Sequence, residues 1–74
     1  MAKVLRTFFF SSYPHEKAAE IEQAIRHSGY SVVPHPDPDV SNICVLAGSK
    51  NNMLALCHAL AKLAPGIKWH GPVD

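Results

Sequence analysis

Five histidines are spread along this sequence of 74 residues, and histidine can both ligate metals and transfer protons near neutral pH. None stands with a cysteine pair at a spacing typical of zinc sites. His35, Asp37 and Asp39 alternate along a proline-rich segment and could share one side of an extended loop. The alternative is a solvated turn, because three flexible ligands without supporting contacts bind metal weakly. We therefore predict no metal and no cofactor.

Serines that follow predicted strands are the candidate nucleophiles. Ser11, Ser12 and Ser49 occupy such positions, and His15 lies three residues after Ser12. Nucleophilic catalysis needs a positioned base and a group that orients it. The spacing of Ser12 and His15 is more typical of a helix N-cap. Since no convergent set of titratable groups can be named, we predict that the protein is not an enzyme.

The polar turn Gly48-Ser49-Lys50-Asn51-Asn52 could hold an anion on backbone amides at a helix start. It lacks the glycine spacing of a P-loop or of a dinucleotide-binding loop. Ordinary helix capping by Ser or Asn is the favoured interpretation.

Composition and charge narrow the class of protein. The chain is 47% hydrophobic and 18% charged, which is enough apolar material for a core, and its net charge is +1. A duplex DNA binder would need a basic surface and a DNA mimic a strongly negative one. Cys44 and Cys57 are expected to be reduced packing residues, with a single disulfide as the alternative. Neither a signal peptide nor a membrane span is evident, so we expect a cytoplasmic protein.

Hydrophobic periodicity predicts six elements in the order β-α-β-β-α-β. Strands are expected at 4–10, 30–33, 43–47 and 67–70, and helices at 14–28 and 52–63. We predict one α+β domain over residues 1–74, with 71–74 as a flexible tail. The expected fold is ferredoxin-like (split βαβ): a four-stranded antiparallel sheet, strands one and three central, and both helices on one face.

That arrangement leaves the other face of the sheet open, and the period of two assigns residues to it. Because Arg6 would be costly in a core, we place Arg6, Phe8 and Phe10 on the open face. The same alternation points Tyr30, Val32, Ile67 and Trp69 inward, and Ser31, Val33, Lys68 and His70 outward. Val4, Val33 and either Cys44 with Leu46 or their neighbours complete an apolar patch. Such a patch is typical of an interface with a partner or with a second copy of the chain in a homodimer. The alternative is an inverted strand phase, or a tail that covers the patch.

Two families of binding domain share features with this chain. RNA-recognition domains have the same strand order and carry aromatic side chains on their central strands, where Phe8 or Phe10 could serve. The third strand, however, has no aromatic residue. Phe10-Ser11-Ser12 with 18–30, and Val45-Leu46-Ala47-Gly48-Ser49 with the second helix, resemble the SPOR peptidoglycan-binding domains of bacterial envelopes. This resemblance implies that the open sheet face would bind glycan strands.

We expect a non-enzymatic protein-binding module. In size and profile the chain looks like a small phage or mobile-element inhibitor of the anti-CRISPR type, which would occlude a site on a larger bacterial complex. Aromatic residues and arginine dominate interface hot spots, so the predicted anchors are Arg6, Phe8, Phe10 and Tyr13. The predicted rim consists of Lys17, Lys50 and Lys68.

Overall fold

The computed structural model describes residues 4–37, 39 and 42–73. The elements follow the order β1 (Arg6–Ser11), the 3₁₀ helix η1 (His15–Lys17), α1 (Ala18–His27), β2 (Ser31–Val33), β3 (Cys44–Ala47), α2 (Lys50–Leu60) and β4 (Lys68–Val73). The strands form one antiparallel sheet in the order β2-β3-β1-β4. The predicted α+β class and the central positions of the first and third strands are therefore confirmed.

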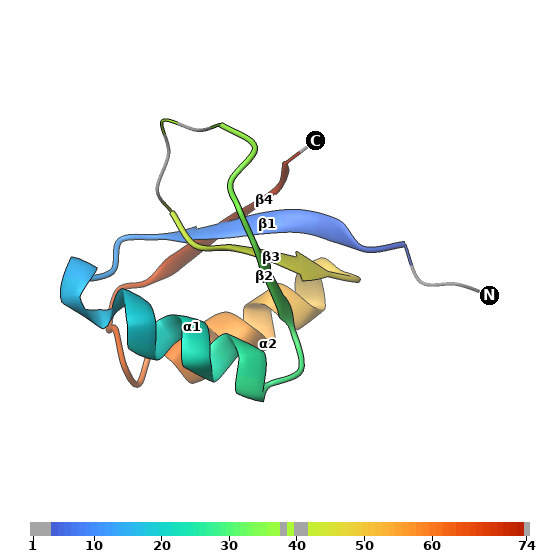
Figure 1. Ribbon diagram of the computed structural model, residues 1–74. Helices are drawn as coiled ribbons and strands as arrows, with labels where there is room; N and C mark the ends of the chain where they lie inside the picture. The colour runs from blue at the N-terminus through green and yellow to red at the C-terminus, as the bar shows by residue number, and fades with distance from the viewer. Residues whose placement is uncertain (1–3, 38, 40–41, 74) are drawn as a thin grey trace.

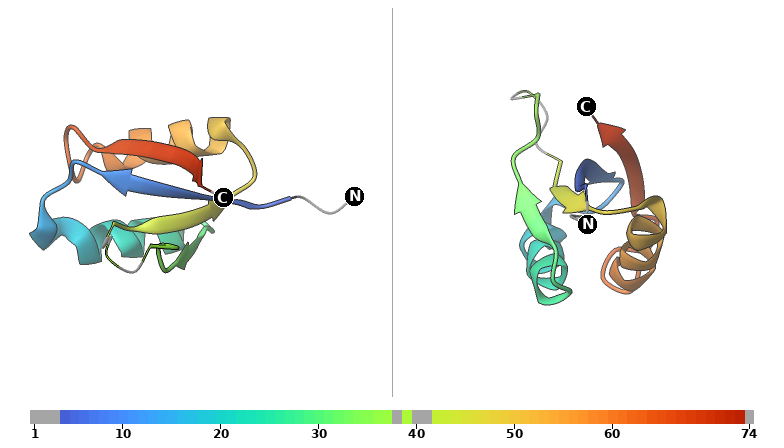
Figure 2. Two further views of the ribbon diagram at one scale, coloured as in Figure 1. Left: turned by 90° about the horizontal axis from the view of Figure 1, so that it is seen from above. Right: turned by 90° about the vertical axis from the view of Figure 1, so that its right-hand side faces the viewer.

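The two helices lie beneath the sheet in Figure 1, and the end-on view in Figure 2 shows them side by side under the strands. The segment that follows β2 rises on the opposite side of the sheet. Within the described residues, no helix has the length and apolar character needed to cross a bilayer.

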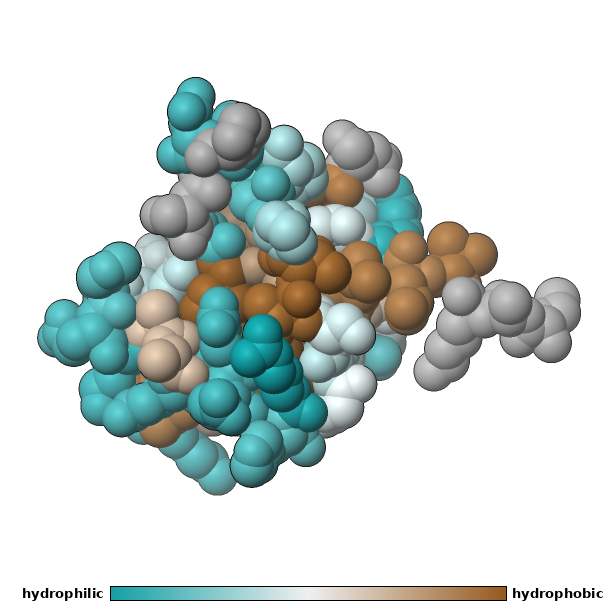
Figure 3. Space-filling view, in the orientation of Figure 1, coloured by the Kyte–Doolittle hydropathy of each residue, from teal (hydrophilic) through white to brown (hydrophobic). Residues whose placement is uncertain are grey.

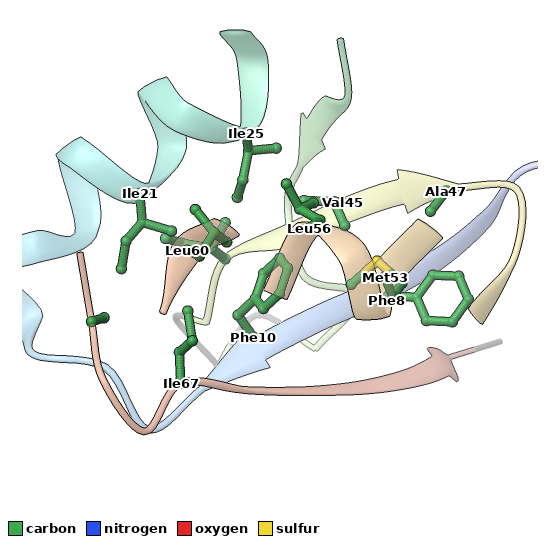
Figure 4. Close-up of a cluster of buried hydrophobic side chains, with 12 residues drawn as sticks. Phe8, Phe10, Ile21, Ile25, Val45, Ala47, Met53, Leu56, Leu60 and Ile67 are labelled. Carbon is green, nitrogen blue, oxygen red and sulfur yellow. The ribbon is translucent and has the colours of Figure 1, made fainter. Parts of the chain in front are cut away.

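The core lies between the sheet and the helices (Figure 4). Phe8 and Phe10 of β1 are 1% and 0% exposed and point toward the helices, which is the reverse of the sequence prediction. The helices contribute five buried side chains to the same cluster, namely Ile21, Ile25, Met53, Leu56 and Leu60. Complete burial of a large apolar side chain stabilises the fold by about 1.5–3 kcal/mol.

The prediction that Arg6, Phe8 and Phe10 lie on the open face was wrong for both phenylalanines, because the exposed position of Arg6 does not determine the face of the other two. Arg6 has the same strand parity as the two phenylalanines, but it is the first residue of β1 and remains exposed. A charged side chain at a strand end reaches water whichever face it starts from, so its cost in a core does not fix the phase of the strand.

The predicted phases of the second and fourth strands are confirmed. Tyr30, Val32, Ile67 and Trp69 belong to the core or pack against it, whereas Ser31, Lys68 and His70 are exposed. Val33 is half-buried and pairs with Cys44, which in turn pairs with Phe9 of β1.

The helix boundaries differ from the prediction at both starts. Ser12 does not cap the first helix: it adopts a left-handed backbone with φ 61°, and a short 3₁₀ turn precedes α1. Ser49 caps α2 as expected, because its hydroxyl oxygen accepts a hydrogen bond from the Asn52 N–H. The helix starts at Lys50 and ends at Leu60, earlier than predicted at each end.

The expected tail is the second half of β4. Residues 71–73 remain in the strand, and Val73 pairs with Thr7 across an irregularity in the ladder between Thr7 and Phe9. Gly71 has φ 129°, and a Cβ atom placed on it would lie 2.8 Å from Cδ1 of Phe8. Glycine is therefore required where β4 passes closest to the buried ring. Residue 74 of the predicted tail lies outside the described residues.

Candidate functional site

The face of the sheet opposite the helices is the candidate site, and strand register defines its residues. Thr7 pairs with Leu46 and with Val73, while Phe9 pairs with Cys44 and with His70. Residues that pair across a ladder share a face. This open face consists of Leu5, Thr7, Phe9, Ser11, Ser31, Val33, Cys44, Leu46, Lys68, His70 and Val73.

One half of the open face is apolar. Leu5 precedes β1, continues its alternation and is 53% exposed, beside the half-buried Leu46. Both side chains line a hollow of about 220 Å³, together with Tyr30 and Ala47. Figure 3 shows apolar surface running from the middle of the molecule toward the N-terminal end of β1. Phe8, Phe10 and Cys44 of the predicted patch are buried, whereas Val4 is 77% exposed. Val33 and Leu46 are half-buried, and β1 adds Leu5 from the other residues of its alternation.

The other half of the open face holds an aromatic and histidine cluster. The rings of Phe9 and His70 are stacked, with centroids 4.8 Å apart and an interplanar angle of 21°. His35, in the segment after β2, meets Phe9 edge-on at 5.2 Å and 72°. The Oγ atom of Ser11 lies 2.6 Å from Nε2 of His70.

Sequence reasoning missed the pairing of Ser11 with His70, which lie 59 residues apart, and tested Ser12 against His15 instead. The available signal was the predicted adjacency of the first and last strands. The wrong phase expected for β1 placed Ser11 on the side of the helices, however, so this signal did not bring it to the face of His70. In the structure both residues lie on the open face.

The residues predicted to contact a partner do not form one surface. Phe8 and Phe10 are buried, so neither can contact a partner without unfolding. Arg6 is exposed at the start of β1, and Lys50 is exposed at the first residue of α2. Lys68 is the one predicted rim residue that lies on the open face, opposite Ser11.

Tyr13 and Lys17 have structural contacts of their own. The Tyr13 hydroxyl accepts a hydrogen bond of 3.1 Å from the Ile43 N–H, and its ring packs against the core. The ammonium group of Lys17 lies 3.3 Å from a carboxylate oxygen of Glu20. Tyr13 therefore ties the turn after β1 to the start of β3.

The hydrogen-bond acceptors of His35 and Asp37, which were weighed as metal ligands, bind backbone groups of their own loop. Nδ1 of His35 accepts a hydrogen bond of 2.9 Å from the Asp37 N–H, and Oδ1 of Asp37 accepts one of 3.0 Å from the Asp39 N–H. These are turn-type hydrogen bonds between side chains and nearby backbone. Over residues 4–37, 39 and 42–73, no three His, Cys, Asp or Glu side chains are grouped closely enough to hold a metal ion.

In the polar turn before α2, Ser49 and Asn52 likewise form hydrogen bonds that cap the helix. The Ser49 hydroxyl donates a hydrogen bond of 3.0 Å to Oδ1 of Asn52 and accepts one of 3.2 Å from its N–H. This reciprocal pair agrees with the capping interpretation of the turn.

Both cysteines are free thiols, as expected. Cys44 is buried in the middle strand β3, between Phe9 and Val33. Cys57 donates a weak hydrogen bond of 3.5 Å from Sγ to the carbonyl oxygen of Ile67. Burial removes both thiols from water and raises the pKa of each above the ordinary 9.0.

Both thiols should react with iodoacetamide more slowly in the folded chain than in the same chain unfolded in urea. A raised pKa lowers the fraction of reactive thiolate at pH 8, and Cys44 should react after the half-buried Cys57. Timed alkylation with peptide mass spectrometry measures both rates. The raised thiol pKa values also make stability depend on pH. Their contribution to the free energy of unfolding is fully present below the unfolded-state pKa of about 9, and it is lost as the pH rises through the folded-state pKa. Equal rates in the folded and unfolded chains would contradict the predicted protection.

Comparison of the chain with protein-family models, with curated proteins and with solved structures finds no match.

Proposed function

We propose that this chain is a non-enzymatic protein-binding module that contacts its partner through the apolar half of the open face. The supporting observation is the exposed Leu5, which lines one hollow together with the half-buried Leu46. This hollow lies at the end of the sheet, where Gly29 and Asn52 also line it. Exposed contiguous apolar surface is a mark of interaction sites. An inhibitor that occludes a site on a larger bacterial complex, as anti-CRISPR proteins do, needs no more than such a face.

We further infer that the fold is ferredoxin-like. The strand order β2-β3-β1-β4 and the antiparallel pairing support this assignment. In a split βαβ fold the helices occupy one face, and the sheet then offers a preformed platform for a partner. A preformed platform binds with less loss of conformational entropy than a loop that must become ordered.

The alternative of single-stranded nucleic acid is less well supported. Base stacking needs an aromatic face that is accessible on the sheet. The Phe9 ring already stacks on His70 and meets the edge of His35. No other aromatic side chain lies on the described part of the open face apart from these histidines. Nucleic acid and peptidoglycan are therefore outcomes to be tested.

Leu5→Asp should weaken partner binding at least tenfold and leave the melting temperature nearly unchanged. Leu5 is 53% exposed, so a carboxylate there costs little in the free protein but must be desolvated in the complex. The matched control is Leu54→Asp, on helix α2, where the leucine is 58% exposed and lies outside the open face. Phe8→Asp is unsuitable as a test of the interface, because that ring is buried.

The wild type and both variants would be immobilised and exposed to bacterial lysate, with bound proteins quantified by mass spectrometry. A protein retained stoichiometrically by wild type and Leu54→Asp but lost with Leu5→Asp supports the proposal. Equal retention by all three, or no protein retained, contradicts it. Light scattering identifies a homodimer. Sedimentation of the protein with peptidoglycan would identify a glycan-binding domain. A mobility shift of a labelled single-stranded RNA would identify a nucleic-acid binder.

A further inference from the structure

Ser11 and His70 form a hydrogen-bonded pair at the end of the open face away from Leu5. Their Oγ and Nε2 atoms are 2.6 Å apart, at the short end of the range for such bonds. In the tautomer protonated on Nδ1, the Ser11 hydroxyl donates to Nε2. This is the geometry in which a histidine can take the proton of an attacking serine.

The His70 ring is held in place by an aromatic contact. It stacks on Phe9 at 4.8 Å, and Phe9 is fixed in turn by the edge contact with His35. In serine nucleophile sites the base is oriented by a third group, which is often a carboxylate. Here a phenyl ring fills the orienting role and keeps Nε2 directed at Oγ.

Lys68 is the residue directly opposite Ser11 on the neighbouring strand. It pairs directly with Ser11 across the β1–β4 ladder and is exposed on the same face. Cβ atoms of directly opposite residues lie about 4.5–5.5 Å apart. A cation at that position favours negative charge that develops on a group attacked by Oγ.

The backbone turns sharply immediately after Ser11. Ser12 adopts φ 61°, a left-handed conformation that is uncommon for residues other than glycine. Such conformations cluster at functional sites, where they fix how a neighbouring side chain is presented. Strand β1 ends at Ser11, and its hydrogen bond with His70 is exposed.

We propose that Ser11 is a reactive nucleophile that accepts acyl or phosphonyl groups from activated donors, with His70 as its base and Lys68 as its charge partner. With a fluorophosphonate, the Oγ–P bond forms as the P–F bond breaks. The hydroxyl proton passes to Nε2 of His70, and fluoride leaves. With an aryl ester, the Oγ–C bond forms as the bond between the carbonyl carbon and the phenoxy oxygen breaks. The hydroxyl proton again passes to Nε2 of His70, and the phenolate leaves. This modification site goes beyond the proposed binding function and does not depend on it.

The test uses the full chain and an alkyl fluorophosphonate, with adducts located by intact-mass and peptide mass spectrometry. We expect one adduct, on Ser11. His70→Gln retains a hydrogen-bond acceptor for Ser11 but provides no base, and should slow labelling about tenfold to hundredfold. Lys68→Met should slow labelling several-fold.

Ser11→Ala should abolish the adduct, whereas Ser28→Ala, at an exposed serine after helix α1, should leave the labelling rate unchanged. The proposal is overturned if no adduct forms, if other serines label as fast as Ser11, or if His70→Gln labels like wild type. Circular dichroism verifies that each variant is folded. Should His70→Gln fail to fold, His70→Asn replaces it, and labelling of that variant at the wild-type rate overturns the proposal equally.

Discussion

Phe10→Ala should unfold this protein or nearly so, whereas Phe9→Ala, one residue earlier in the same strand, should leave it folded. Phe10 is 0% exposed and contributes to the cluster beneath the sheet. Truncation of a buried phenylalanine to alanine costs about 3–5 kcal/mol. A domain of 74 residues is stable by roughly 4–11 kcal/mol, so this single change removes a large share of its stability.

Phe9 is the matched control because it has the same side chain and the same strand but lies half-buried on the open face. Truncation of the Phe9 ring removes its contacts with the rings of His35 and His70. Each such contact contributes about 0.5–1.5 kcal/mol to the free energy of unfolding. Urea denaturation followed by circular dichroism measures both variants. A larger loss for Phe9→Ala than for Phe10→Ala would mean that the strand presents its opposite face to the helices.

Gly71→Ala should destabilise the fold by about 2–4 kcal/mol, from backbone strain and overpacking together. The added Cβ would lie 2.8 Å from Cδ1 and 3.1 Å from Cα of Phe8, on a backbone with φ 129°. Phe8 cannot move aside, because its ring is buried and packs edge-on against Trp69 at 5.9 Å.

Gly66→Ala separates the two causes. Gly66 also has a positive φ of 92°, but a Cβ there meets nothing within 4 Å. Its replacement should therefore show the backbone cost alone, about 1–2 kcal/mol. Thermal and urea unfolding of both variants give the difference. If Gly66→Ala loses as much stability as Gly71→Ala, the close approach of β4 to Phe8 contributes nothing.

The order of the elements, the central strands and the cap at Ser49 could be predicted because each depends on local pattern. The phase of β1 could not, since Val4 to Phe10 is apolar on both faces and Arg6 was the only polar guide besides Thr7. Arg6 indicated the wrong phase because a residue at the end of a strand can stay exposed on either face, whereas residues at its centre cannot. Only packing against the helices decides between two apolar faces.

The candidate site was harder to predict than the fold. Gly71 and Pro72 indicated a chain end, yet an edge strand tolerates proline because its outward side needs no ladder donor. The cluster of Ser11, Phe9 and His70 depends on the register between β1 and β4, including the irregularity near Thr7. Register between strands so distant in sequence is a tertiary property that no local pattern encodes.

The position of β1 in the middle of the sheet has a consequence during synthesis. Its three consecutive phenylalanines are synthesised before β3 and β4. A further 59 residues must be added after Ser11 before His70, its hydrogen-bond partner, has been synthesised. At roughly 5–20 residues per second, this delay lasts several seconds. For that time the segment from Val4 to Phe10 is an apolar strand without partners, the kind of sequence that aggregates or engages a chaperone. During synthesis, the complete sheet can therefore form only after β4 has been made.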